Sequence, residues 1–274
     1  MTAVPEFRGE NLMRIGAVDF HYELPLISER PGHLGIEKTR PLLEDYADLW
    51  AGLRPRRVVE LGIRRGGSTA MLSELGGAER IVSIELSPNR IEALDRYIDE
   101  QGVADVVRPH FGVDQADRAR LRRIVDEEFA GQPLDLVIDD ASHLYAESRA
   151  SFEVLFPHLR PGGLYLLEDW RWQHIFGAGI VAALEGDDPA RRDHVQREVQ
   201  RRMVEQHRTE PATPMSRLVV ELVLARAVSG DVAQDIEIRD HWAAVRRGPA
   251  ALDQDTFRLD DHAPDLFHVL PQVS

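Results

Sequence analysis

The sequence predicts an α/β protein with a doubly wound, mostly parallel sheet, an N-terminal extension and a helical insertion. Three observations support this fold class: short apolar runs alternate with amphipathic runs, turn residues separate the runs, and acidic residues follow several of the apolar runs. The 274 residues suit a single large domain. We expect an extension and a helix over 1–53, a ligand-binding core over 54–175, and an insertion with closing strands over 176–274.

The expected elements then follow in order. Residues 1–35 contain several prolines and glycines and read as irregular, and an amphipathic helix follows at 39–53. Strands are predicted at 57–62, 80–85, 106–112, 134–139 and 164–167, with helices between them at 68–75, 88–101, 117–129 and 146–159. Ser87 is the expected N-cap of helix 88–101, with Pro88 at its first position. The carboxyl ends of parallel strands lie along one edge of such a sheet, where ligands bind.

The pattern changes after residue 175. A strongly charged helix is expected at 188–207 and an apolar helix at 215–227. The stretch 235–247 carries apolar residues at intervals and is expected to add an antiparallel strand that completes the sheet.

The composition excludes several classes of function. A formal net charge of −14 repels phosphate backbones, so no nucleic-acid partner is expected. The chain has no cysteine, and hence no disulfide, thiolate zinc site or cysteine nucleophile. We recognise no signal peptide and no apolar run of the ~20 residues that span a bilayer, so we expect a cytoplasmic protein without a membrane partner. Lys38 is the only lysine, which we attribute to the arginine usage of a GC-rich genome.

The first strand ends in a turn that suits a cofactor. Glu60 precedes this turn and Gly62 lies in it, while Gly67 and Ser68 begin the following helix and can present amide groups to a ligand. The spacing differs from the dinucleotide glycine pattern. Glu60 would also repel an anionic cofactor, but not one that carries an ammonium or sulfonium group.

Two further acids follow the second and third strands. Glu85 is placed to accept hydrogen bonds from ribose hydroxyls, and Asp114 to accept one from an adenine amino group. Alternatively, both acids only stabilise helix starts. Glu60, Gly62, Glu85 and Asp114, in this order at consecutive strand ends, resemble the S-adenosylmethionine (SAM) site of class I methyltransferases. The resemblance implies a Rossmann-like fold with SAM as the cofactor.

Acids also follow the fourth and fifth strands. Asp139 and Asp140 end one strand, His143 stands three residues beyond Asp140, and Glu168 and Asp169 end the other. Acids crowded at a partly buried strand end repel each other unless a cation is present, which favours a divalent metal over a helix cap. A histidine beside such a site has the chemistry of a general base.

The segments 137–143 and 156–170 resemble the metal-dependent sugar O-methyltransferases of macrolide and polyketide antibiotic biosynthesis. The resemblance runs from about Arg57 to Trp170 and is weaker outside that range. It implies an enzyme that uses SAM and Mg²⁺ to methylate a sugar hydroxyl, rhamnose-like or of another deoxysugar, on a glycosylated natural product. It also implies a homo-oligomer.

The same resemblance implies a role for each residue at the fourth and fifth strand ends. Asp140, Glu168 and Asp169 are then the Mg²⁺ ligands, His143 is the base, and Asp139 faces the cofactor or orients the ligands. Coordination to Mg²⁺ lowers the pKa of a sugar hydroxyl, so that a histidine within hydrogen-bond reach can take its proton.

Other interpretations remain open. The motifs also resemble catechol-type O-methyltransferases and a cephalosporin-hydroxylase-like group, which implies a non-sugar acceptor, although the catechol enzymes usually place a lysine where His143 stands. A protein that binds SAM without catalysis is a third hypothesis. Trp170, Trp172 and His174 either line an acceptor pocket or form a lid or dimer contact. The same alternatives apply to His241 and Trp242, for which core packing is favoured.

Overall fold

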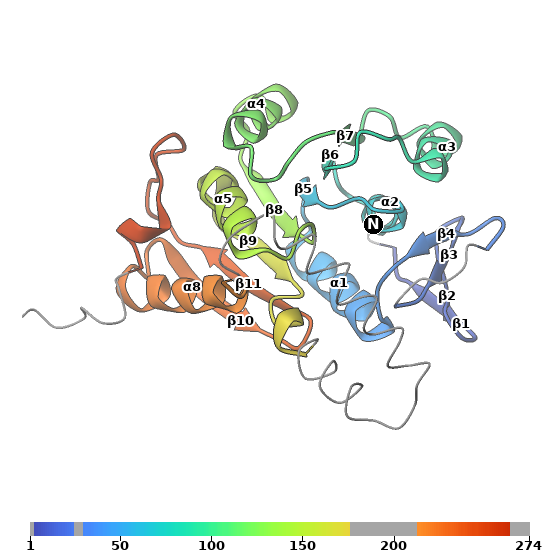
Figure 1. Ribbon diagram of the computed structural model, residues 1–274. Coiled ribbons are helices and arrows are strands. Elements are labelled where there is room, and N and C mark those ends of the chain that lie inside the picture. Colours follow the sequence, from blue (N-terminus) through green and yellow to red (C-terminus); the bar gives the residue numbers. More distant parts are fainter. Residues whose placement is uncertain (1–2, 25–29, 176–212, 264–274) are drawn as a thin grey trace, which may run out of the picture.

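The computed structural model describes residues 3–24, 30–175 and 213–263. Its centre is a seven-stranded sheet in the order β10-β11-β9-β8-β5-β6-β7 (Figure 1). These strands are β5 (Arg57–Leu61), β6 (Arg80–Glu85), β7 (Val107–Phe111), β8 (Leu134–Asp139), β9 (Leu159–Glu168), β10 (Ala233–Ile238) and β11 (Trp242–Arg247). β5 to β9 run parallel, and β11 pairs antiparallel with β9, which confirms the predicted fold class.

The order of the strands reverses between β5 and β8. The chain moves outward from β5 through β6 to β7, then returns to β8 on the other side of β5 and continues to β9. In doubly wound sheets the ligand-binding crevice lies at the carboxyl ends of the strands at such a reversal. β5 ends just before Gly62 and β8 ends just before Asp140. The reversal therefore brings the residues predicted to bind the cofactor, after β5, next to those predicted to bind the metal, after β8.

The helices cover both faces of this sheet. They are α1 (Arg40–Leu53), α2 (Gly67–Leu75), α3 (Glu92–Gln101), α4 (Arg118–Phe129), α5 (Tyr145–Leu155) and α8 (Ser216–Val228), with short 3₁₀ turns η1 (Phe156–His158) and η2 (Leu259–Asp261). Val59, Val137 and Tyr165 face a core shared with α4, α5 and α8, whereas Val58 and Leu136 face a second core shared with α1, α2 and α3 (Figure 1). Successive side chains of a strand point to opposite faces of the sheet, so two consecutive acids at a strand end point to different sides of it.

Most helices lie close to their predicted positions, but the predicted start of helix 88–101 is wrong. α3 begins at Glu92, with Ile91 rather than Ser87 at its N-cap. The Ser87 amide donates to the Glu85 carboxylate at 2.9 Å, and Ser87 Oγ accepts a hydrogen bond from the Asn89 amide at 3.2 Å. These local hydrogen bonds compete with the helix and hold the segment in bends.

The N-terminal residues are not irregular, contrary to the sequence-based expectation. They form a small sheet of β1 (Glu6–Arg8), β2 (Leu12–Ile15), β3 (Val18–Tyr22) and β4 (Leu34–Ile36). Gly9 and Gly16, which suggested irregular structure, adopt positive φ in the turns between these strands. Met13, Ile15 and Phe20 pack into the same core as α1 and α2. The small sheet thereby holds the β4–α1 connection against the large sheet.

The C-terminal part closes the large sheet with two strands instead of the single strand expected within 235–247. β10 and β11 form an antiparallel hairpin at the edge. α8 confirms the apolar helix predicted at 215–227, whereas the charged helix predicted at 188–207 lies outside the described residues. Among the helices that the structure describes, none has the length and apolarity to cross a membrane.

Gly62 offers a test of how tightly β5 and β8 approach each other. It has φ of +93°, and a Cβ there would collide with the Asp140 carbonyl oxygen, whereas Gly77 has φ of +88° with no atom near its Cβ position. We expect Gly62→Ala to lower the free energy of unfolding by ~1–3 kcal/mol more than Gly77→Ala, because only the former adds a steric collision to the backbone strain. Urea denaturation of both variants measures the difference, and equal losses would contradict the close approach.

Candidate functional site

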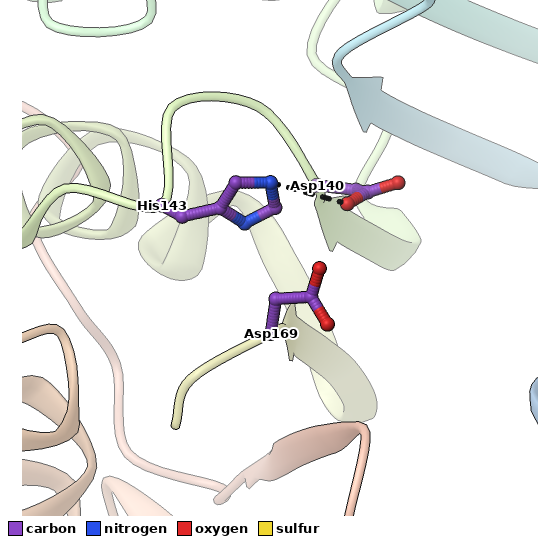
Figure 2. Close-up of side chains that lie close together, drawn as sticks. All are labelled: Asp140, His143 and Asp169. Carbon is purple, nitrogen blue, oxygen red and sulfur yellow. Dashed lines mark ion pairs between the residues drawn. The ribbon is translucent and has the colours of Figure 1, made fainter. Parts of the chain in front are cut away.

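Asp140, His143 and Asp169 converge at the carboxyl ends of β8 and β9 (Figure 2). One potential ligand atom from each of the three lies within 4.8 Å of the others, and all three residues are partly buried. His143 Nε2 is 3.8 Å from Asp140 Oδ1. The loop after β8 places His143 beside Asp140, and Asp169 directly follows β9. Three of the four predicted reaction-side residues, from two distant segments, are therefore neighbours in space, whereas Glu168 does not belong to this group.

The backbone at two of these residues is unusual. His143 and Asp169 have φ of +54° and +52°, a region that residues other than glycine rarely adopt. The Asp169 amide donates to the His241 carbonyl at 2.8 Å, and the Trp172 amide donates to the Asp169 carbonyl at 2.9 Å. Backbone strain of this kind is concentrated at functional sites, where the surrounding structure holds it in place.

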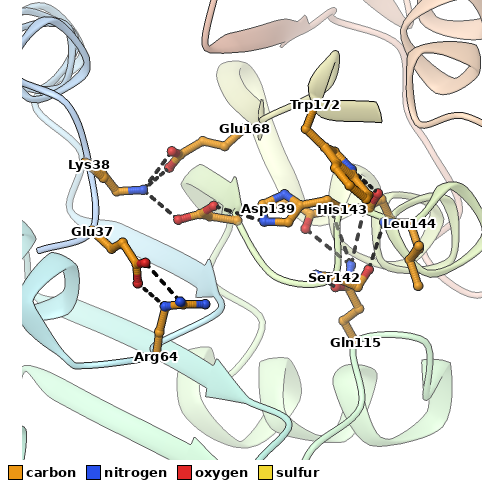
Figure 3. Close-up of polar contacts among 12 residues, drawn as sticks. Glu37, Lys38, Arg64, Gln115, Asp139, Ser142, His143, Leu144, Glu168 and Trp172 are labelled. Atoms are coloured by element: carbon orange, nitrogen blue, oxygen red, sulfur yellow. Dashed lines mark hydrogen bonds and ion pairs between the residues drawn. The ribbon is translucent and has the colours of Figure 1, made fainter. Parts of the chain in front are cut away.

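Glu168 points away from Asp169 into the core shared with α1, because the two residues are consecutive on a strand. Both of its carboxylate oxygens accept hydrogen bonds from the Lys38 ammonium at 2.7 Å (Figure 3). One of them also accepts a hydrogen bond from the Tyr46 hydroxyl. Burial and the nearby charge of Asp140 raise the pKa of Glu168 to about 8, against the opposing effect of Lys38. Glu168 is thus joined to Asp140 through the lysine.

Lys38 also donates to Asp140 Oδ2 at 2.6 Å, so that one ammonium group connects the ends of β8 and β9. Burial disfavours its charge, but Asp140 and Glu168 outweigh this effect and raise the pKa of Lys38 above its usual value. Sequence analysis missed this residue by attributing the scarcity of lysine to coding bias alone. The available signal was that a chain with so much arginine keeps a single lysine.

Asp139 lies apart from this group, on the α5 side of the sheet. Its buried carboxylate accepts hydrogen bonds from Tyr165 at 3.1 Å, Ser151 at 3.2 Å and Gln115 at 3.2 Å. Burial raises the pKa of Asp139, and these hydrogen bonds with the charge of His143 oppose the increase. Gln115 also accepts a hydrogen bond from the Ser142 amide, which ties Asp139 to the loop that carries His143 (Figure 3).

Glu60, the first acid assigned to the cofactor, is buried beneath the sheet edge. Its carboxylate accepts hydrogen bonds from the Thr69 hydroxyl at 2.6 Å and the Ser83 hydroxyl at 2.7 Å. Burial raises the pKa of Glu60, while hydrogen bonds from Ser68, Thr69 and Ser83 oppose this. The described contacts of Glu60 and Ser68 therefore hold the start of α2 against β5.

Glu85 and Asp114 remain accessible at the same edge, but both also organise local backbone. Glu85 accepts hydrogen bonds from the amides of Ile63 at 3.1 Å and Arg64 at 2.9 Å, in addition to that of Ser87. Asp114 accepts one from the Ala116 amide at 2.8 Å. Glu85, which is partly buried, thereby shapes the loop after β5, and a structural role does not prevent it or the exposed Asp114 from binding a ligand.

Gly62 and Gly67 permit two close approaches between protein segments. A Cβ at Gly67 would collide with the carbonyl oxygen of Gly35 in β4, just as one at Gly62 would collide with Asp140. The sequence-based explanation, close approach of a ligand, is therefore incomplete. Gly62 allows the loop that carries Asp140 to pack against the end of β5. Gly67 allows the segment before Lys38 to pack against the start of α2.

The aromatic residues near the site differ in their surroundings. Trp172 Nε1 donates to the His143 carbonyl at 2.8 Å, and the two rings lie edge to face at 6.5 Å (Figure 3). Trp170 donates to the Arg239 carbonyl, and His174 contacts Ser216 Oγ at 2.7 Å. Trp242 is buried in the core, as favoured from the sequence, and donates to Asp45. Trp172 therefore contacts the backbone of the predicted base, and Trp242 is the cross-strand partner of Glu168.

The donor set fits a hard divalent cation. The carboxylates of Asp140 and Asp169 supply oxygen ligands of the kind that Mg²⁺ prefers, and Glu168 lies one residue away. Nδ1 of His143 is buried and has no hydrogen-bond partner among the residues that the structure describes. Buried polar atoms are nearly always satisfied in native proteins, so this atom indicates a group that completes the site when bound.

The sequence matches the family described as a methyltransferase domain over residues 59–170. A tetracenomycin-C 3'-O-methyltransferase from Streptomyces olivaceus, which acts on a 2-methoxy-rhamnosyl derivative, is 33% identical over 58% of this chain and 43% of that protein. Mycinamicin VI 2''-O-methyltransferase from Micromonospora griseorubida is 38% identical over 41% of this chain and 27% of its own length. The chain thus matches less than half of each of these relatives.

Solved structures agree with the fold. The methyltransferase MycE of the mycinamycin pathway, in complex with Mg, SAH and mycinamycin VI, has a TM-score of 0.51 and 25% identity over 75% of this chain and 49% of that one. An SAH-bound methyltransferase from Podospora anserina has a TM-score of 0.50 and 18% identity, over 77% of this chain and 79% of its own. With the strand order, these similarities show that the chain has the Rossmann-like fold of class I methyltransferases, and residues 59–170 match the methyltransferase domain.

Proposed function

We propose that this protein is a SAM- and Mg²⁺-dependent O-methyltransferase that methylates a sugar hydroxyl of a glycosylated natural product. The observation that carries the proposal is the convergence of Asp140, His143 and Asp169 at the strand reversal of a methyltransferase domain. The named relatives, which methylate the sugars of tetracenomycin and mycinamicin derivatives, support a glycosylated acceptor with a rhamnose-like or other deoxysugar. The expected cytoplasmic location and homo-oligomeric state remain predictions.

The cofactor half of the site would be formed by the edge of β5, β6 and β7. In the proposal Glu85 binds the ribose hydroxyls and Asp114 the adenine amino group, while Gly62, Gly67 and Ser68 provide the backbone around the amino-acid portion. Glu60 and Asp139, both buried, contribute negative charge and support from below the surface. SAM bound there would supply the methyl group on a sulfonium centre, which is already a good electrophile.

The metal half would hold Mg²⁺ through Asp140 and Asp169, with Glu168, whose carboxylate is bound by Lys38 and Tyr46, as the third proposed ligand. The ion would lower the pKa of a coordinated sugar hydroxyl. His143 takes the acceptor proton at Nε2, the ring nitrogen that lies 3.8 Å from Asp140. The neighbouring carboxylates stabilise the protonated imidazole, and Trp172 limits the orientations of the ring through its contact with the His143 carbonyl.

The role of His143 is tested by comparison with a histidine outside the site. We expect His143→Ala to lower kcat for a glycosylated acceptor by ~10²–10⁴-fold, because the hydroxyl loses its base. His33→Ala serves as the control, because His33 is a partly exposed histidine of the small N-terminal sheet region whose ring contacts the Pro31 carbonyl. Calorimetry should show unchanged SAM binding in both variants, and full activity of His143→Ala would overturn the mechanism.

The metal requirement and the acceptor class are tested together. EDTA should abolish methyl transfer from radiolabelled SAM to rhamnosylated polyketides, and added Mg²⁺ should restore it. Asp169→Asn should weaken Mn²⁺ binding, measured by electron paramagnetic resonance, because it removes a charged ligand. Turnover of catechols but not of glycosides would overturn the acceptor, and undiminished activity in EDTA would overturn the metal.

The cofactor assignment is tested at Glu85. We expect Glu85→Gln to weaken SAM binding by about 10- to 100-fold, as is typical for loss of a hydrogen bond to a charged group. Glu92→Gln, an exposed acid at the first residue of α3, provides the matched control. Thermal unfolding without cofactor reports separately on the loop that Glu85 organises, and equal SAM affinity in the two variants would contradict the assignment.

A further inference from the structure

Lys38 provides a cation within the acidic site. Its ammonium lies 2.6 Å from Asp140 Oδ2 and 2.7 Å from both oxygens of Glu168, and the side chain is almost entirely buried. Buried lysines require compensation of their charge, and Lys38 has two carboxylates. The ammonium donates to both carboxylates at hydrogen-bond distance, which suits a positioning group rather than a general base.

Several features position this lysine. The β4–α1 connection carries it, and the close packing of Gly35 on Gly67 holds that connection at the sheet edge. Tyr46, one turn into α1, donates a hydrogen bond to the same Glu168 carboxylate. The charge of the adjacent residue Glu37 is compensated by Arg64, which donates a hydrogen bond to its carboxylate (Figure 3). Lys38 is therefore held in a specific place beside the acids.

The formal charges of the site then match a divalent ion. With all three acids ionised, as in a site that holds a cation, Asp140, Glu168 and Asp169 carry three negative charges, and Lys38 neutralises one of them. A net double negative charge remains for an ion held by these acids. Without Lys38 the net charge of the site would be one unit more negative. Because Coulomb attraction scales with the charge of the ion, the affinity for a trivalent ion would then rise more than that for a divalent ion.

We propose that Lys38 is a positioning residue that adjusts the charge of the acidic site to a divalent cation and holds Glu168 and Asp140 together before the ion binds. This inference rests on the proposed Mg²⁺ site. It assigns to the only lysine of the chain a role in ion selectivity, distinct from those of the ligands and the base.

The experiment compares the affinities of purified full-length protein for Mn²⁺ and Tb³⁺. Mn²⁺ is measured by electron paramagnetic resonance and Tb³⁺ by luminescence, for which Trp172 is a nearby sensitiser. The Coulomb repulsion between the ammonium and the ion is proportional to the charge of the ion, so it is larger for a trivalent ion than for a divalent one. We therefore expect Lys38→Met to raise the Tb³⁺ to Mn²⁺ affinity ratio by about tenfold or more.

Two matched variants separate charge from geometry. Lys38→Arg keeps the charge, and Tyr46→Phe removes an uncharged hydrogen bond to the same carboxylate, so both should leave the ratio within about threefold of wild type. Glu168→Gln removes a negative charge and should lower the ratio. This variant retains Lys38 and tests the sign of the effect even if Lys38→Met does not fold.

The outcomes distinguish the two proposals. If the wild-type protein binds neither ion, both the proposed metal site and the proposed role of Lys38 are contradicted. If wild type binds Mn²⁺ but the ratio is unchanged in both Lys38→Met and Glu168→Gln, the metal site stands and the charge-matching role is overturned. A rise in the first variant with a fall in the second supports the role.

Discussion

The buried ion contact of Lys38 with Asp140 and Glu168 connects every part of the molecule that forms the site. The acids end β8 and β9, and the lysine comes from the connection between the small N-terminal sheet and α1. Two carboxylates this close repel each other, and a buried ammonium requires them as partners. The contact thus joins the segment after the small sheet to the ends of both strands, next to the close approach of Gly35 and Gly67.

The alternation of side chains along β8 and β9 divides the acids by function. Asp139 faces the α5 side, where Tyr165, Ser151 and Gln115 satisfy it, whereas Asp140 turns toward the open edge. In the same way Glu168 enters the α1 side while Asp169 joins His143. Each pair of consecutive acids therefore has one buried carboxylate, Asp139 or Glu168, and one at the open edge, Asp140 or Asp169.

Much of the large sheet was predictable because each strand is a short apolar run bounded by turns, as in 134–139, whose bounds agree with β8. The small sheet was missed because its strands are short and interrupted by glycines in tight turns. The start of α3 was misplaced because Ser87 and Pro88 form a suitable cap locally, but Glu85, at the end of the preceding strand, already holds the Ser87 amide. Such competition between local signals is decided by geometry that a sequence pattern does not contain.

The sequence by itself determined the parallel sheet, the acids at its strand ends and the histidine beyond Asp140, because apolar periodicity and turn residues act over short distances. Only the tertiary structure decided which of these residues are buried and which groups each of them contacts. It buried Glu60 and Asp139, gave Glu85 a role in shaping the loop after β5, and placed Lys38 between Asp140 and Glu168, which are 102 and 130 residues away in the chain. Pairing of charges over such separations depends on the packing of three distant segments, which no local pattern encodes.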